Sequence, residues 1–153
     1  MFDKIASFFS RKGQNTPPPD PSPTIMESEE VSRRILLAED NRINSKVACR
    51  QLQKLSYEVD AVINGQEALD VMAYTSYGLI LMDCQMPIMD GFEATRQIRR
   101  SERTEGKKRI PIIAMTANIS NADRQKCLDT GMDDFLSKPV QMAVLGQLIE
   151  KWL

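Results

Sequence analysis

Four short apolar segments of this chain each lead into polar side chains that could do chemistry together. In chain order these side chains belong to Glu39 and Asp40, Asp83, Thr116 and Lys138. An aspartate can accept a phosphoryl group as a mixed anhydride, and in such a transfer the protein chiefly positions groups and neutralises negative charge. A hydroxyl and an ammonium group can hold the phosphoryl oxygens, so these residue types together suit phosphoryl transfer.

The three carboxylates need a compensating charge if they meet. Like charges a few ångströms apart repel one another unless a cation or a shared proton lies between them. The sequence contains no histidine, so a metal must be bound through oxygen, which favours a hard cation such as Mg²⁺. Taken singly, each residue has a simpler explanation, because acidic residues favour helix N-termini, threonines follow strands and lysines are commonly solvated.

The elements that must position these residues alternate along the chain. Continuous apolar runs bounded by turn residues predict buried parallel strands, and apolar residues at intervals of three and four predict helices. Strands are expected at residues 35–38, 59–62, 79–82, 110–115 and 135–136, and helices at 41–55, 66–73, 92–100, 121–130 and 140–152. The helical pattern after Asn64-Gly65 predicts a strand-to-helix loop there rather than a hairpin, and Gly131 is expected to cap a helix in a left-handed conformation.

Five strands separated by helices predict a doubly wound α/β fold of the flavodoxin-like type, with helices on both faces of a five-stranded parallel sheet. The second and fifth strands are the least apolar and should lie at the edges, which favours the order 2-1-3-4-5. That order brings Glu39, Asp40 and Asp83 into one crevice between the first and third strands. Thr116 and Lys138 then arrive at the same edge of the sheet, and the proline after Lys138 raises the prospect of a cis peptide bond.

Composition excludes several other kinds of protein. The 153 residues are 42% hydrophobic and carry a net charge of −1, which suits one globular domain and offers no basic surface for nucleic acid. No apolar stretch is long enough to span a membrane, and the sequence shows no secretion signal. Cys49, Cys84 and Cys127 are few and widely spaced, which predicts packed free thiols in a reducing cytoplasm. The basic run at residues 99–109 is interrupted by glutamates and predicts a solvated loop.

The first 33 residues have a different composition. Five prolines fall between residues 16 and 24, so residues 1–33 are expected to form a flexible segment before a domain at 34–153. Phe2, Ile5, Ala6 and Phe9 would share one face of a short amphipathic helix. Such a helix could dock a partner or a membrane surface, whereas a frayed terminus is the plainer alternative.

Four motifs make residues 34–153 resemble the receiver domain of two-component response regulators, of the type found in hybrid kinases and phosphorelays. The motifs are ILLAEDN at 35–41, MDCQMPIMDG at 82–91, MTAN at 115–118 and DFLSKP at 134–139. The resemblance implies that Asp83 is the phosphoacceptor and that Lys138 and Thr116 assist it.

The resemblance also implies a Mg²⁺ bound by Asp40, Asp83 and the backbone carbonyl of Gln85, with Glu39 acting through water. Gln85 and Asn118 stand where the family tunes the rate of dephosphorylation.

The resemblance further implies how a signal leaves the site. Thr116 and Phe135 would form a switch pair, in which Thr116 moves toward the phosphoryl group and the aromatic ring turns into the vacated space. This switch would alter a surface formed by the fourth helix (121–130), the fifth strand (135–136) and the fifth helix (140–152), where a downstream protein could bind.

Partners follow from the same resemblance. Because the sequence has no histidine, the donor is expected to be a separate histidine kinase or histidine phosphotransfer protein, docking at the first helix and the loops around the acidic pocket. A signalling receiver is expected rather than an enzyme. An aspartate phosphatase would need a second carboxylate where Gln85 stands, and a pseudo-receiver that binds partners without phosphorylation is the third interpretation. A stand-alone regulator and a piece of a hybrid kinase both remain open.

Overall fold

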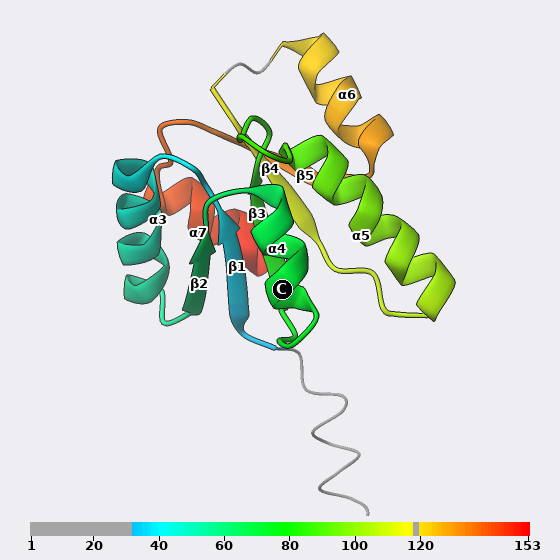
Figure 1. Cartoon of the computed structure of the whole chain (residues 1–153). Helices are drawn as coiled ribbons and strands as arrows, with labels where there is room; N and C mark the ends of the chain where they lie inside the picture. Colours follow the sequence, from blue (N-terminus) through cyan, green and yellow to red (C-terminus); the bar gives the residue numbers. More distant parts are fainter. Residues whose placement is uncertain (1–31, 118–119) are drawn as a thin grey trace, which may run out of the picture. The chain divides into compact units, whose positions relative to one another are not determined.

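The structure, a computed structural model, describes residues 32–117 and 120–153. In these residues the strands are β1 (Arg34–Ala38), β2 (Glu58–Val62), β3 (Leu79–Asp83), β4 (Ile112–Thr116) and β5 (Asp134–Ser137) (Figure 1). The helices are α3 (Arg42–Lys54), α4 (Gly65–Met72), α5 (Gly91–Glu105), α6 (Asn121–Thr130) and α7 (Met142–Trp152). The predicted N-terminal segment, up to residue 31, and Asn118 lie outside the described residues.

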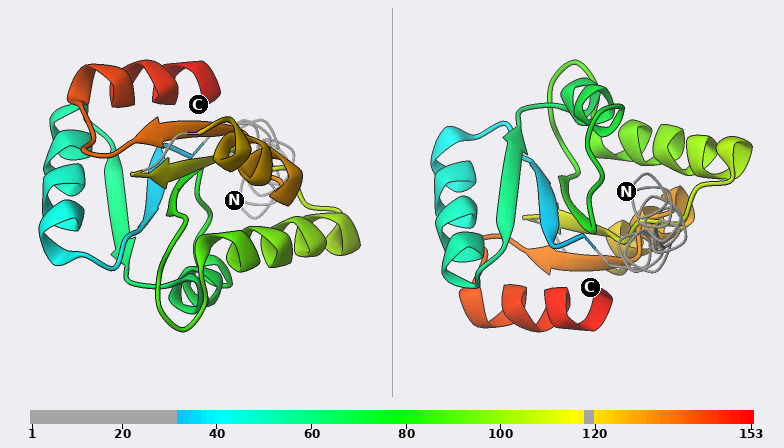
Figure 2. Two further views of the ribbon diagram at one scale, coloured as in Figure 1. Left: turned by 90° about the horizontal axis from the view of Figure 1, so that it is seen from above. Right: turned by 90° about the horizontal axis from the view of Figure 1, so that it is seen from below.

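The sheet has the predicted topology. Its strands are parallel and lie in the order β2-β1-β3-β4-β5, so the doubly wound, flavodoxin-like fold is confirmed. Figure 2 shows the sheet between two groups of helices, with α3 and α7 on one face and α4 and α5 on the other. The least apolar strands do lie at the two edges, because an edge strand has one neighbour and keeps more contact with water.

Alternation along the strands supplies the core on both faces. In β1, Leu36 and Ala38 pack with α4 and α5, whereas Ile35 and Leu37 pack with α3 and α7. Successive side chains of a strand point to opposite faces, so a strand covered on both faces must be apolar throughout. The same rule explains β3, where every residue is buried, including the terminal Asp83.

Side-chain caps fix where the helices begin after the strands. Asn41 Oδ1 accepts from the backbone N–H groups of Ile43 and Asn44 at the start of α3, and Asn64 Oδ1 accepts from Glu67 N at the start of α4. These bonds satisfy amides that the first helical turn leaves free. The strand-to-helix loop predicted at Asn64-Gly65 is therefore confirmed, as is the left-handed cap at Gly131, where φ is 116°.

The prediction of a solvated loop at residues 99–109 is confirmed for residues 107–109, which are exposed and outside any helix, but was wrong for residues 99–105. Helix α5 continues to Glu105, and Arg99 is 4% exposed. Its guanidinium donates to Glu102 and Asp133, each at 2.7 Å at its shortest, and to the carbonyls of Gly131 and Ile110 at 2.9 Å. A buried charge is tolerated only when it is paired and hydrogen-bonded, and these partners supply both conditions.

The remaining differences are small. Strand β4 begins two residues after its predicted start and α7 begins two residues after its predicted start, whereas α6 has its predicted bounds. Helix and strand ends are where sequence patterns are least informative. Among the described residues, no helix is both long and apolar enough to cross a bilayer.

Candidate functional site

The carboxyl ends of four strands meet at one pocket. Strand pairing sets Ala38 beside Met82, Asp83 beside Met115, and Thr116 beside Ser137, so the residues that follow β1, β3, β4 and β5 share an edge of the sheet. A pocket of about 400 Å³ opens there. It is lined by Glu39, Asp40, Asn41, Asn44, Asp83, Cys84, Gln85, Phe92, Thr116, Ala117, Asp123, Lys126, Cys127 and Lys138.

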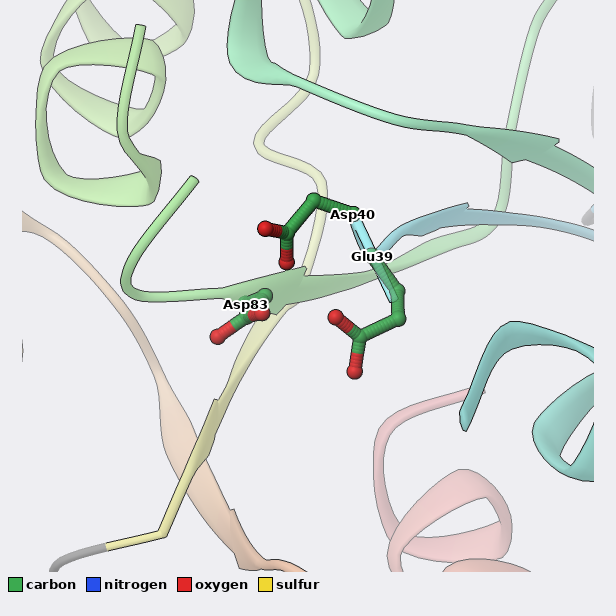
Figure 3. Close-up of side chains that lie close together, drawn as sticks. All are labelled: Glu39, Asp40 and Asp83. Carbon is green, nitrogen blue, oxygen red and sulfur yellow. The ribbon is translucent and has the colours of Figure 1, made fainter. Parts of the chain in front are cut away.

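Three carboxylates converge in this pocket, as predicted. Each of Glu39, Asp40 and Asp83 offers an oxygen, and these oxygens all lie within 4.8 Å of one another. Figure 3 shows the three side chains pointing toward one another from the ends of β1 and β3. Glu39 is 2% exposed and Asp83 is 5% exposed, whereas Asp40 is exposed at the mouth.

Lys138 neutralises part of this negative charge. Its Nζ lies 2.9 Å from Asp83 Oδ2 and 2.9 Å from Glu39 Oε1. The loop that carries it is fixed by a bond from Lys138 N to the carbonyl of Thr116 at 3.0 Å, and the Lys138–Pro139 peptide bond is cis. One ammonium group therefore contacts two of the three carboxylates directly.

The protonation of the site reflects this imbalance of charge. Burial, and contact with the Glu39 carboxylate, raise the pKa of Asp83 from an ordinary 3.8 to about 7, although Lys138 opposes the rise. Burial also tends to raise the pKa of Glu39, but hydrogen bonds with Asp83 and Lys138 outweigh it and lower the pKa overall. Burial tends to lower the pKa of Lys138, and its two carboxylate partners raise it instead. The site therefore favours one additional positive charge, as a proton or a cation.

The residues present fit a Mg²⁺ ion. The candidate ligands are carboxylate oxygens, which a hard divalent cation prefers, and their spacing allows one ion to contact more than one of them. Gln85 also lines the pocket, and its backbone N–H donates to Asp83 Oδ1 at 3.3 Å. Its carbonyl remains a predicted ligand.

The two members of the predicted switch pair lie in different surroundings. Thr116 ends β4, is half-buried and lines the pocket. Phe135 lies in β5, packs against the core beneath α4, α5 and α6, and is not among the residues that line the pocket. The Arg124 guanidinium of α6 lies 5.5 Å from the centre of the Phe135 ring, so the ring contacts a helix of the predicted switch surface.

Helix α6 contributes pocket residues that the sequence did not reveal. Cys127 is 1% exposed and its Sγ lies 3.9 Å from Cys84 Sγ. The Lys126 ammonium lies 4.2 Å from the centre of the Phe92 ring at the same pocket. The sequence of α6 has no apolar stripe that would indicate its inner face, so only the position of α6 after β4 could have suggested these contacts. Burial raises the pKa of both thiols.

Comparison with known proteins agrees with this geometry. Residues 35–150 match the family described as the response regulator receiver domain. This chain belongs to that family. The receiver is 46% identical over 130 residues to the hybrid signal transduction protein dokA of Dictyostelium discoideum, a match that covers 85% of this chain and 8% of that protein. It spans 5–16% of the length of the curated relatives compared.

Two solved receivers have the same fold. One is the receiver domain of the sensor histidine kinase PA1611 from Pseudomonas aeruginosa, which was solved with a magnesium ion coordinated in its active site cleft. It is 42% identical to this chain, with a TM-score of 0.71, and the match covers 79% of this chain and 97% of that one. The receiver domain of Ssk1 from Saccharomyces cerevisiae, in complex with the histidine phosphotransfer protein Ypd1, is 34% identical, with a TM-score of 0.76 over 79% of this chain and 88% of that one.

Proposed function

We propose that this receiver accepts a phosphoryl group on Asp83 from a phosphorylated histidine of another protein, in a step that requires Mg²⁺. The observation that carries the proposal is the convergence of Lys138 Nζ, at 2.9 Å, on the carboxylates of Asp83 and Glu39. Asp40 adds a third carboxylate beside Asp83 and Glu39, and these oxygens could bind a metal ion together. A nucleophile, a fixed cation and a metal-binding cluster in one pocket are the parts that phosphoryl transfer needs. The magnesium ion in the cleft of the PA1611 receiver supports the choice of metal.

The transfer is a substitution at phosphorus. An oxygen of the ionised Asp83 carboxylate forms the new O–P bond while the N–P bond of the phosphohistidine breaks, and its electron pair leaves with the imidazole nitrogen. A Mg²⁺ held by Asp40, Asp83 and the backbone carbonyl of Gln85, with Glu39 acting through water, would supply positive charge to the phosphoryl oxygens. Because Asp83 is only 5% exposed, an acyl phosphate on it would have less contact with bulk water than one on an exposed side chain.

Lys138 and Thr116 link the phosphoryl group to the rest of the domain. Lys138 already donates to Asp83, and a phosphoryl oxygen on that carboxylate would take over this bond. The Thr116 hydroxyl, which lines the same pocket, would donate to a second oxygen. Movement of Thr116 toward the phosphoryl group would leave space into which the Phe135 ring turns, and this rotation would alter its contact with Arg124 of α6.

The donor protein would dock on α3 and the adjoining loops. Apolar side chains are exposed there: Ile43 at 73% and Val47 at 46% on α3, Ile63 at 52% after β2 and Ile88 at 84% after β3. The two loops lie together, because Gly65 N donates to the Met89 carbonyl at 2.9 Å. An apolar patch beside a charged pocket suits a protein partner. The complex of the Ssk1 receiver with Ypd1 supports a histidine phosphotransfer protein, or the kinase itself, as that partner.

A downstream protein would bind the surface of α6, β5 and α7. Leu128 of α6 is 48% exposed, and Met142 and Val144 of α7 are 39% and 41% exposed. Trp152 Nε1 donates to Asp134 Oδ2 at 2.9 Å, which connects the last turn of α7 to β5. A change at Phe135 in β5 is therefore close to the contacts that shape this surface.

We further propose that the receiver is a signalling module rather than an enzyme with external substrates, and that it works in the cytoplasm. Gln85 occupies the position two residues after the nucleophile, where an aspartate phosphatase carries its second carboxylate, and an amide cannot act as an acid or base. The free thiols of Cys49, Cys84 and Cys127 support a reducing compartment.

The test is to incubate the full chain with Mg²⁺ and acetyl phosphate and to measure its intact mass. We expect the wild type to gain one phosphoryl group that is lost in alkali, and we expect no gain for Asp83→Asn or in the presence of EDTA. Asp129→Asn is the matched control, because Asp129 is exposed on α6 and its carboxylate accepts from the Gln125 side chain. The proposal is wrong if Asp83→Asn is labelled as well as the wild type. Continuous release of phosphate from varied esters would favour a phosphatase instead, and no adduct would favour a pseudo-receiver.

A further inference from the structure

Two buried thiols face each other in the wall of the phosphoacceptor pocket. Cys84 directly follows Asp83 and is 6% exposed, and Cys127 lies in α6 and is 1% exposed. Their Sγ atoms are 3.9 Å apart, although the residues are 43 positions apart in the chain. The phosphoryl transfer proposed above uses neither thiol.

The geometry allows these sulfurs to be joined. A disulfide bond is about 2.05 Å long, so the sulfurs must approach each other by roughly 2 Å, and rotation of the two side chains together with a shift of α6 would have to supply this movement. Both residues line the pocket, and Cys84, at 6% exposed against 1% for Cys127, is the sulfur that a small oxidant entering the pocket meets first. The third thiol cannot compete, because Cys49 packs against the opposite face of the sheet, with α3 and α7.

We propose that Cys84 and Cys127 form a reversible disulfide when the receiver meets a peroxide, and that this bond fastens α6 to the phosphoacceptor loop. In the first step one thiol is oxidised to a sulfenic acid while the peroxide O–O bond breaks and, for hydrogen peroxide, one water leaves. In the second step the other thiol displaces the sulfenic oxygen, so that the S–S bond forms and a second water leaves. Two thiols thus lose two electrons and two protons, and one hydrogen peroxide becomes two waters.

The bond would restrain the part of the receiver that responds to phosphorylation. Helix α6 contacts Phe135 of β5 through Arg124, and Cys127 lies one turn further along the same helix. A covalent link from Cys127 to the residue after Asp83 fixes α6 to the end of β3. This expectation rests on the function proposed above: the oxidised receiver accepts a phosphoryl group on Asp83, while the surface of α6, β5 and α7 stays in its unphosphorylated arrangement.

The bond itself is tested without phosphorylation. The reduced full chain is treated with hydrogen peroxide, alkylated, digested and mapped by mass spectrometry. We expect an intact mass lower by two hydrogens, a linked peptide pair containing Cys84 and Cys127, and recovery of both thiols with dithiothreitol. Cys49→Ser should form the same link, whereas Cys84→Ser and Cys127→Ser should not. The inference is overturned if the oxidised wild type carries only sulfinic or sulfonic acids, or if its disulfides join Cys49 or two chains.

The effect on signalling is tested with the fluorescence of Trp152, the single tryptophan of the chain. We expect Mg²⁺ and acetyl phosphate to change this fluorescence in the reduced protein and the change to be lost in the oxidised protein, although the intact mass shows the phosphoryl group in both. An equal change in both forms would refute the restraint on α6. If even the reduced protein takes up no phosphoryl group, the proposed function fails, whereas a linked peptide with Cys84 and Cys127 still upholds the disulfide.

Discussion

Replacing the phosphoacceptor by its amide should stabilise the metal-free receiver. The folded state holds the Asp83 proton up to a pKa of about 7, whereas the unfolded chain releases it near 3.8. Between these values the unfolded state binds fewer protons, so the free energy of unfolding falls as the pH rises through this range and is constant above it. At 1.36 kcal/mol per pH unit the full loss is about 4 kcal/mol. The pKa of Glu39 moves in the opposite direction and offsets part of this loss, so we expect Asp83→Asn to raise the free energy of unfolding near pH 8 by less than about 4 kcal/mol.

The assay is urea denaturation in EDTA, followed by far-UV circular dichroism. The free energies of unfolding of the wild type and Asp83→Asn are compared at about pH 8 and at about pH 5. At pH 5 their difference should fall to less than half of its value at pH 8, because Asp83 in the folded wild type is then protonated. The Asn amide keeps the size of the side chain, and Lys138 keeps Glu39 at 2.9 Å. The exposed Asp129→Asn should change stability by less than about 0.5 kcal/mol at either pH. The link between burial and the protonation of Asp83 would be refuted if Asp83→Asn were no more stable than the wild type at pH 8. It would also be refuted if the difference in free energy of unfolding were the same at both pH values.

Two further substitutions probe the contacts of two cations, the half-buried Lys138 and the buried Arg99. Lys138→Ala should keep the far-UV spectrum of the wild type and take up a phosphoryl group more slowly, yet lose most of the phosphorylation-dependent change in Trp152 fluorescence; a full fluorescence change would contradict the role given to Lys138. Arg99→Leu should destabilise the protein by about 3 kcal/mol in urea, because Glu102 loses its guanidinium partner while Asp133 keeps only Arg109 as a cation; a loss below about 1 kcal/mol would show that the remaining partners compensate for the guanidinium.

Much of the fold follows from local patterns. The strands β1 and β3 are covered on both faces, so they are continuously apolar and easy to locate, and their polar terminal residues mark the site directly. Asp83 could be assigned to the pocket because a buried strand that ends in a carboxylate leaves few other places for that group. The strand order also followed from composition, because the weakly apolar β2 and β5 suit the edges of the sheet.

The parts that could not be predicted depend on partners distant in the chain. Arg99 looks like a surface residue in a basic run, because its acceptor Asp133 is 34 positions away. The contact between Cys84 and Cys127 depends on how α6 lies over the end of β3, which no periodicity in α6 reveals. The sequence places Phe135 on β5, but the side of the ring that meets Arg124 is settled only by packing.

The contacts of Arg99 lie at the end of the sheet opposite the pocket. Asp133, which Arg99 holds, also accepts from Ile112 N at 2.9 Å, so the first residues of β4 and β5 are anchored together. Thr116 lies at the other end of β4, about 13 Å away at about 3.3 Å per residue. A movement of Thr116 of the kind proposed above would therefore take place at the end of β4 that lacks this anchor, while the end at Ile112 would stay tied to Asp133.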